Sequence, residues 1–96
     1  MFEVRQTGDF SRWFERLRDR HTRARVLIRI RRLSLGDPGD VAPVGQGVSE
    51  LRIDCGPGYR VYYKQRGKIL VVLLAGGDER TQQRDIERAK EVARRL

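Results

Sequence analysis

Residues 47–78, GVSELRIDCGPGYRVYYKQRGKILVVLLAGGD, contain the clearest structural pattern of the chain. On both sides of residues 56–58, Gly-Pro-Gly, apolar and polar residues alternate, and successive side chains of a strand point to opposite faces of a sheet. The pattern therefore predicts two antiparallel strands, residues 48–55 and 59–64, joined by a hairpin loop. The near-continuous apolar run of residues 68–75 predicts a third strand, central in the sheet and apolar on both faces.

The alternation also predicts the register of the hairpin. A loop of three residues places apolar side chains opposite one another, whereas a loop of two residues would place Arg52 opposite Val61 and mix the two faces. We therefore expect the three-residue loop, in which Arg52 lies opposite Tyr62 and Asp54 lies opposite Arg60. In this register two arginines and a tyrosine share one face and are close enough to hold a single phosphate group.

Three further segments predict helices. The apolar residues of the segment 10–17 recur at the spacing of one helix face, so a first helix is expected there, ending near Arg20. Residues 22–35 fit a helix or, in part, a strand, and we expect a helix because the segment is long and lacks glycine and proline. A last helix is expected from residue 79 or 81 to residue 96.

The remaining segments complete a single α+β domain, residues 1–96. Residues 2–6 predict a short first strand. Residues 36–47 contain four glycines and two prolines and predict an ordered loop, and Gly76-Gly77 predicts a tight turn between the last strand and the last helix. The expected order is strand, helix, helix, three strands and helix, with the two helices packed as a hairpin on one face of a mainly antiparallel sheet.

The chain is strongly basic, with a formal net charge of +8 and an isoelectric point near 10.7. Of its 21 basic residues, 18 are arginines, whose planar guanidinium group matches phosphate oxygens in pairs. Such a domain is typical of proteins that bind nucleic acid, an acidic protein or a membrane surface. A solvated basic surface without a ligand is the alternative.

The cysteine content and the lengths of the apolar runs argue against a disulfide-bonded, membrane-spanning or secreted protein. Cys55 is the only cysteine, so neither an internal disulfide nor a thiol metal cluster can form, as is typical of a reducing cytosol. The longest apolar run, residues 69–75, is too short to span a bilayer, and residues 1–5 do not begin a secretory signal. We therefore expect a cytoplasmic protein with no membrane association, no metal and no cofactor.

Four separated segments resemble the RelE/ParE toxin superfamily and, more narrowly, the HigB-like addiction module killer toxins. They are FSRWFERLRDR (residues 10–20), RARVLIRIRRL (23–33), the segment 47–63, and LLAGGDERTQQRDIERA (73–89). The resemblance covers nearly the whole chain. It implies a RelE/ParE-like α+β fold of the order β-α-α-β-β-β-α.

The resemblance also implies an activity and partners. Such proteins are toxins of type II toxin–antitoxin systems, each with a small antitoxin, and many are endoribonucleases that enter the ribosome and cut mRNA. The implied reaction needs no metal, because the RNA 2′-hydroxyl attacks the adjacent phosphate. It requires cationic donors near the phosphate and proton transfer at both ends.

Three arginines match positions where the family carries basic phosphate-binding side chains. Arg52 and Arg60 lie on the two hairpin strands and, by resemblance, stabilise the scissile phosphate. Arg80 follows the last strand and supports them. With Tyr62, they form the expected catalytic set.

Several family members place a tyrosine or histidine near the C-terminus as general acid or base. This chain has no tyrosine after Tyr63 and no histidine after His21. Tyr62, Asp78 and Glu79 are the candidate substitutes, and Asp78 could equally be the N-cap of the last helix.

Residues 12–32 hold nine arginines and two acidic residues, a pattern that predicts docking on RNA. Within the expected helices and hairpin, Arg23, Arg25 and Lys64 are the candidate RNA-binding residues. Two other functions remain open. One is a non-enzymatic, ParE-like inhibitor of DNA gyrase, and the other is a basic RNA-binding module without toxicity.

Overall fold

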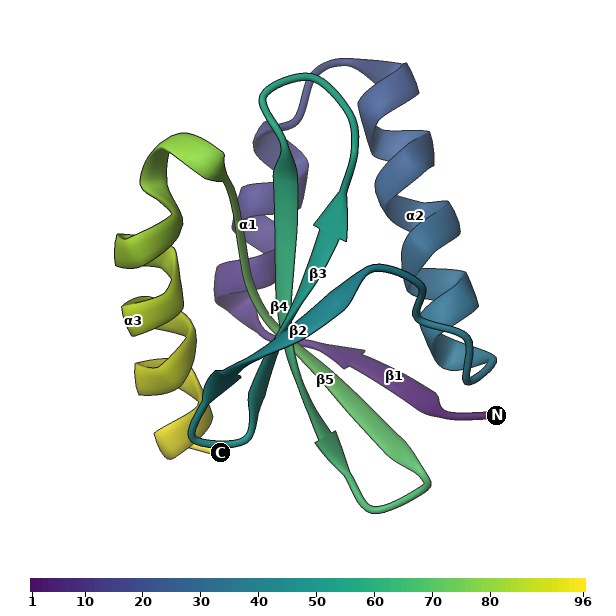
Figure 1. Ribbon diagram of the computed structural model, residues 1–96, viewed down its shortest axis with the longest axis vertical. Coiled ribbons are helices and arrows are strands. Elements are labelled where there is room, and N and C mark those ends of the chain that lie inside the picture. Colours follow the sequence, from purple (N-terminus) through teal and green to yellow (C-terminus); the bar gives the residue numbers. More distant parts are fainter.

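A five-stranded mixed sheet lies between two layers of helices in the computed structural model, which describes residues 1–96 (Figure 1). Its strand order is β1-β5-β4-β3-β2. The strands are β1 (Glu3–Gln6), β2 (Val41–Gly45), β3 (Val48–Ile53), β4 (Tyr59–Arg66) and β5 (Leu70–Asp78). The helices are α1 (Gly8–Arg16), α2 (Arg20–Ser34) and α3 (Gln82–Arg94), the last preceded by a short 3-10 turn, Glu79–Thr81. The expected α+β class and the three helices are confirmed.

The edge strand β2 was not expected. Residues 36–47 are not wholly a loop, because Val41–Gly45 pairs with β3 in an antiparallel manner, with an irregularity between Pro43 and Gly45. The prediction of a loop was based on the proline and glycine content of this segment. An edge strand tolerates proline and glycine, because one side of its backbone does not hydrogen-bond to another strand. The four strands β2 to β5 form an antiparallel meander, and β1 joins β5 in parallel at the other edge.

The predicted register of the hairpin is wrong by two residues. Arg52 lies opposite Arg60, and Ile53 opposite Tyr59, so residues 54–58 form a five-residue loop. The reason is local hydrogen bonding, because the Cys55 N–H donates to the Ile53 carbonyl at 2.9 Å and the Cys55 carbonyl accepts from the Gly58 N–H at 3.1 Å. A shift of two residues preserves the faces, so the predicted grouping of side chains on each face still holds.

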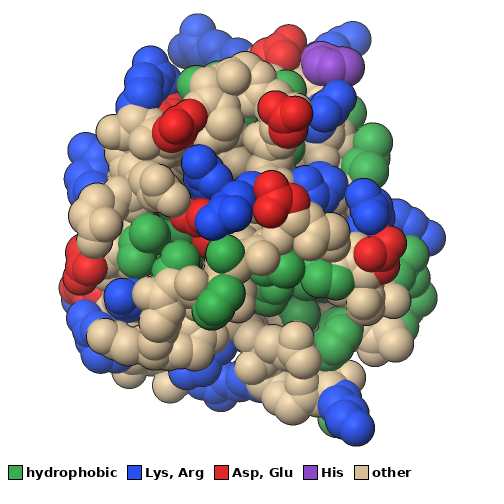
Figure 2. All heavy atoms as spheres, viewed as in Figure 1, with side chains coloured by type: hydrophobic (Ala, Val, Ile, Leu, Met, Phe, Trp, Pro, Cys, Tyr) green, Lys and Arg blue, Asp and Glu red, His purple; other side chains and the backbone are tan.

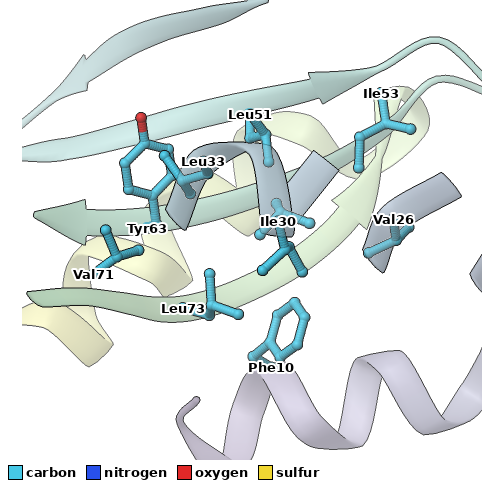
Figure 3. Packing of buried hydrophobic residues seen from close by; sticks show 10 residues of the cluster. Phe10, Val26, Ile30, Leu33, Leu51, Ile53, Tyr63, Val71 and Leu73 are labelled. Atoms are coloured by element: carbon cyan, nitrogen blue, oxygen red, sulfur yellow. The ribbon is translucent and has the colours of Figure 1, made fainter. Parts of the chain in front are cut away.

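Each face of the sheet has its own apolar core. Helices α1 and α2 cover one face, and Figure 3 shows Phe10 and Ile30 from these helices next to Leu73 of β5. Helix α3 covers the other face, where Ala89 packs with Tyr62. Figure 1 shows α3 on one side of the sheet and α2 on the other. Burial on both sides explains why β5 reads as a continuous apolar run.

The boundary between α1 and α2 is set by Asp19. Its carboxylate accepts a hydrogen bond from the Thr22 N–H at 3.1 Å and caps α2, so α1 ends at Arg16 rather than near Arg20 as expected. The choice of a helix for residues 22–35 is confirmed. None of the three helices combines the length and apolar content that crossing a bilayer requires.

The two glycines of β5 have a different role from the one expected. Gly76 and Gly77 lie within the strand and not in a turn. A Cβ atom on Gly76 would overlap the Trp13 ring, and one on Gly77 would overlap the Asp85 carboxylate. The glycines therefore let α1 and α3 approach the strand closely from opposite faces.

Candidate functional site

Arg52 and Arg60 meet in a surface pocket at the hairpin end of the sheet, which we call the strand pocket. It has a volume of about 290 Å³. Its lining residues are Asp40, Arg52, Ile53, Asp54, Gly58, Tyr59, Arg60 and Glu79. The predicted convergence of the two arginines is confirmed, because they are direct cross-strand partners on one face.

A buried carboxylate that sequence reasoning missed lies beneath this pocket. Glu50 is fully buried and accepts hydrogen bonds from Arg52 Nε at 3.0 Å, Tyr62 OH at 3.2 Å and Gln82 Nε2 at 2.8 Å. Arg60 Nη1 lies 3.6 Å from Glu50 Oε1. One carboxylate thus connects β3, β4 and α3 and fixes the positions of both guanidinium groups.

The surroundings of Glu50 keep it ionised. Burial alone would raise the pKa of Glu50, but hydrogen bonds from Gln82 and Arg52, together with the nearby charge of Arg60, outweigh burial and lower it. An ionised carboxylate with this many donors is a poor proton acceptor. Glu50 therefore acts on the strand pocket by orienting the arginines and by offsetting part of their charge.

Tyr62 lies under the strand pocket and not in it. It shares the face of Arg60, as expected, but its side chain is fully buried against α3. Burial, and then the charge of Glu50, raises the pKa of Tyr62. The phenol is thus held as a donor to Glu50, without the exposure that contact with a substrate requires.

The segment after β5 contributes Glu79 to the pocket rather than Arg80. The Glu79 N–H donates to the Gly58 carbonyl at 2.9 Å, which holds Glu79 against the hairpin loop. Arg80 is 78% exposed and pairs with Asp78 at 2.9 Å. Hydrogen bonding from Arg80 lowers the pKa of Asp78. Asp78 caps the short 3-10 turn Glu79–Thr81 and not the last helix as expected, because Thr81 occupies the N-cap position of α3.

The lining of the strand pocket is of mixed charge. Two arginines and three carboxylates give it a net charge of −1, before the buried Glu50 is counted. Arg52 Nη1 also lies 3.6 Å from Asp40 Oδ1. The pocket thus places cationic donors beside carboxylates that can accept a proton. No group of three or more His, Cys, Asp or Glu side chains is arranged to hold a metal ion.

The three residues predicted to bind RNA do not form one surface. Arg23 donates to the Leu17 carbonyl at 3.1 Å and lies over the Phe14 ring, so it joins α1 to α2. Lys64 pairs with Val48, four positions along β4 from Arg60. Of the three, only Arg25 is placed beside the hairpin end, where it donates to the Asp54 carbonyl at 2.9 Å.

Charged side chains of both signs gather at the hairpin end of the molecule. Figure 2 shows Lys and Arg side chains interleaved with Asp and Glu side chains over the upper half of this view, above a band of hydrophobic side chains. The hairpin between β3 and β4 occupies the same upper region in Figure 1. The surface near the strand pocket therefore carries interleaved positive and negative side chains and is not uniformly basic.

Comparison with known proteins identifies a full-length relative. No family model matches the chain. Over 94 residues it is 44% identical to a protein of Haemophilus influenzae described as "Uncharacterized protein", and the match covers 98% of this chain and 95% of that protein. The chain therefore belongs to the same family as this Haemophilus influenzae protein.

Proposed function

We propose that this protein is the toxin of a type II toxin–antitoxin system, with a RelE/ParE-like, HigB-like fold, and that it cuts mRNA on the ribosome in the cytoplasm. The observation that supports the proposal most directly is the strand pocket, where Arg52 and Arg60 face one another across two strands with Glu79 beside them. This pairs the two kinds of group that the reaction requires, cationic donors and a proton acceptor.

The proposed reaction is an attack of the RNA 2′-hydroxyl on the adjacent phosphorus. A new P–O2′ bond forms and the P–O5′ bond breaks, which leaves a 2′,3′-cyclic phosphate and a 5′-hydroxyl. Arg52 and Arg60 donate hydrogen bonds to the phosphoryl oxygens as negative charge grows on them. Glu79 accepts the proton of the 2′-hydroxyl, and the leaving 5′ oxygen takes up a proton from water.

Glu50 is the positioning residue in this scheme. Through its contact with Arg52 Nε and its proximity to Arg60 Nη1, it fixes two long side chains that would otherwise sample many rotamers. Fixed donors stabilise a transition state better than mobile ones, because their reorganisation does not have to occur during the reaction.

The test is cleavage of mRNA in a translating extract, with mapped RNA ends. Arg60→Ala is expected to lower the rate of cleavage by roughly a hundredfold or more, and Glu79→Gln by a comparable factor. Arg66→Ala, at the far end of the same strand, is the matched control and is expected to cut as wild type does. Equal cleavage by wild type and Arg60→Ala would contradict the assignment.

The partner proposed for the toxin is a small antitoxin. With a net charge of +8, the chain favours a partner that presents acidic segments, since complementary charge speeds association and excludes other partners. Copurification of the two proteins, with loss of the complex at high salt, is the expected result.

A second function is favoured by one observation, the net charge of −1 on the pocket lining. Arginines already bound to carboxylates bind a phosphate less tightly, which fits a non-enzymatic, ParE-like inhibitor of DNA gyrase. Double-strand DNA breaks with intact mRNA would support that function. Normal growth with neither effect would leave a basic RNA-binding module.

A further inference from the structure

A second pocket adjoins the strand pocket and differs from it in charge. It has a volume of about 350 Å³ and lies between α2 and the hairpin end, so we call it the helix pocket. Its lining residues are Arg25, Ile28, Arg29, Arg32, Ile53 and Asp54. Ile53 and Asp54 also line the strand pocket, so the two pockets share a wall.

The guanidinium groups of the helix pocket are bound chiefly to backbone carbonyls. Arg25 donates to the Asp54 carbonyl at 2.9 Å. Arg29 Nη2 donates to the Pro38 carbonyl at 2.8 Å and Arg29 Nη1 to the Arg52 carbonyl, whereas Arg29 Nε is buried without a partner. A carbonyl satisfies a donor but does not neutralise its charge, so these hydrogen bonds leave the positive charge of both side chains in place.

The carboxylates that line this pocket are fewer than its arginines. The lining carries three arginines and one carboxylate, a net charge of +2. Arg32 pairs with Asp37 at 3.1 Å, but that carboxylate is 72% exposed and does not line the pocket. Burial, and then the charge of Arg32, lowers the pKa of Arg29, as expected where cations are crowded together.

We propose that the helix pocket binds a backbone phosphate of the same single-stranded RNA whose scissile linkage enters the strand pocket. The inference rests on the proposed function, because it assigns a second phosphate of that substrate. The shared wall at Ile53 and Asp54 lets one strand pass from one pocket to the other. Arginine forks suit phosphate oxygens, and Ile28, which is 59% exposed, offers an apolar surface to a ribose or base beside them.

The test is a binding measurement that does not require cleavage. The probes are fluorescent 2′-O-methyl oligoribonucleotides, which lack the attacking hydroxyl, either as a dinucleotide with one linkage or as a longer single strand. For the longer strand, the double variant Arg25→Gln/Arg32→Gln is expected to bind about tenfold more weakly at low salt. The magnitude of its slope of log affinity against log salt is expected to fall by about 0.7, since the pocket binds one phosphate and each phosphate contact on a single strand contributes about 0.7.

Two comparisons keep the result specific. The dinucleotide, which cannot reach both pockets at once, is expected to lose less affinity for the double variant than the longer strand does. Arg66→Gln/Lys68→Gln likewise removes two positive charges, at and just beyond the far end of β4, and is expected to leave both affinities unchanged. The proposal is overturned if the double variant keeps the wild-type salt slope, or if the dinucleotide loses as much affinity as the longer strand.

Further measurements test whether a change in RNA affinity comes from lost charge, from misfolding of the variant, or from a preference for acidic proteins. Arg25→Lys/Arg32→Lys keeps the charges and is expected to retain most of the salt slope, and thermal unfolding of each variant confirms that it is folded. Polyglutamate is expected to compete weakly, and competition as strong as that of RNA at equal charge would make the pocket a protein-docking site and overturn the proposal. A protein that shows this binding pattern but does not cut mRNA retains the helix pocket and loses only the proposed catalysis.

Discussion

The strand pocket and the helix pocket share Ile53 and Asp54, yet their arginines bond chiefly to carboxylates in the first pocket and chiefly to backbone carbonyls in the second. In the strand pocket, Arg52 bonds to the carboxylate of Glu50 and lies near that of Asp40. In the helix pocket, Arg25 bonds to a carbonyl. The comparison teaches that the number of arginines around a pocket does not predict its affinity for anions, because the acceptor that each arginine already has determines how much charge is left.

The two pockets are therefore suited to different tasks. A guanidinium fixed by a buried carboxylate is held in one position, which suits a step where geometry matters more than attraction. A guanidinium bound to carbonyls keeps its full charge and suits attraction of a polyanion. The first three predictions below each change one pocket and leave the other as a reference, and the last changes the wall that the two pockets share.

The largest effect is expected from Glu50→Gln, which removes the carboxylate beneath the strand pocket. Arg52 and Arg60 then lose the negative charge that they share, and the free energy of unfolding is expected to fall by about 3 kcal/mol, as when one partner of a buried ion pair is removed. Urea denaturation measures it. Asp40→Asn removes the exposed partner of Arg52 and is the control, with an expected loss below about 1 kcal/mol; equal losses would contradict the special position of Glu50.

A smaller loss is expected from Arg29→Leu in the helix pocket. The variant removes hydrogen bonds to the carbonyls of Pro38 and Arg52, and the free energy of unfolding is expected to fall by about 2 kcal/mol. Arg32→Leu, which breaks only an exposed ion pair with Asp37, is expected to change it by less than about 1 kcal/mol. If Arg32→Leu were the more destabilising change, the carbonyl contacts of Arg29 would not hold this region together.

The dependence of stability on acid pH is expected to differ between wild type and Glu50→Gln. The pKa of Glu50 lies below its ordinary value of 4.5, so its ionised form stabilises the fold above that pH, and this stability is lost as the pH falls through the lowered pKa. Wild type and Glu50→Gln are therefore expected to converge in stability as the pH falls below 4.5 and through the lowered pKa of Glu50. A gap that stays constant from neutral to acid pH, measured by denaturation at each pH, would show that the charge of Glu50 does not matter.

The smallest effect is expected from Asp54→Asn, in the wall that the two pockets share. Asp54 is the only carboxylate that lines the helix pocket, and it is exposed. Asp54→Asn is expected to raise the affinity for single-stranded RNA by roughly two- to fivefold at low salt, because one repulsive charge is removed. Stability is expected to stay within about 0.5 kcal/mol of wild type. Fluorescence anisotropy measures the binding, and unchanged affinity would mean that RNA does not pass this wall.

Strand alternation was enough to predict part of the candidate site. It placed Arg52 and Arg60 on one face, and the error of two residues in the register left this result intact because side chains repeat every two positions. The register itself depends on backbone bonds within the loop around Cys55, which no pattern of side-chain polarity reports.

Glu50 shows what sequence patterns miss. It lies two residues before Arg52, so its presence on the same face could have been read from the alternation. Its burial could not, because a buried carboxylate depends on donors that come from β4 and α3. Strand β2 was missed for a related reason, since its pairing with β3, and not its own composition, makes it a strand.

The adjacent glycines of β5 have a consequence for how chains of this family can change in length. Trp13 of α1 and Asp85 of α3 touch the same short piece of backbone from opposite sides, at Gly76 and Gly77 respectively. Inserting or deleting one residue upstream in β5 would exchange these two surfaces and disturb both helical layers together. We therefore expect insertions and deletions among relatives to fall in the loops and to spare this strand.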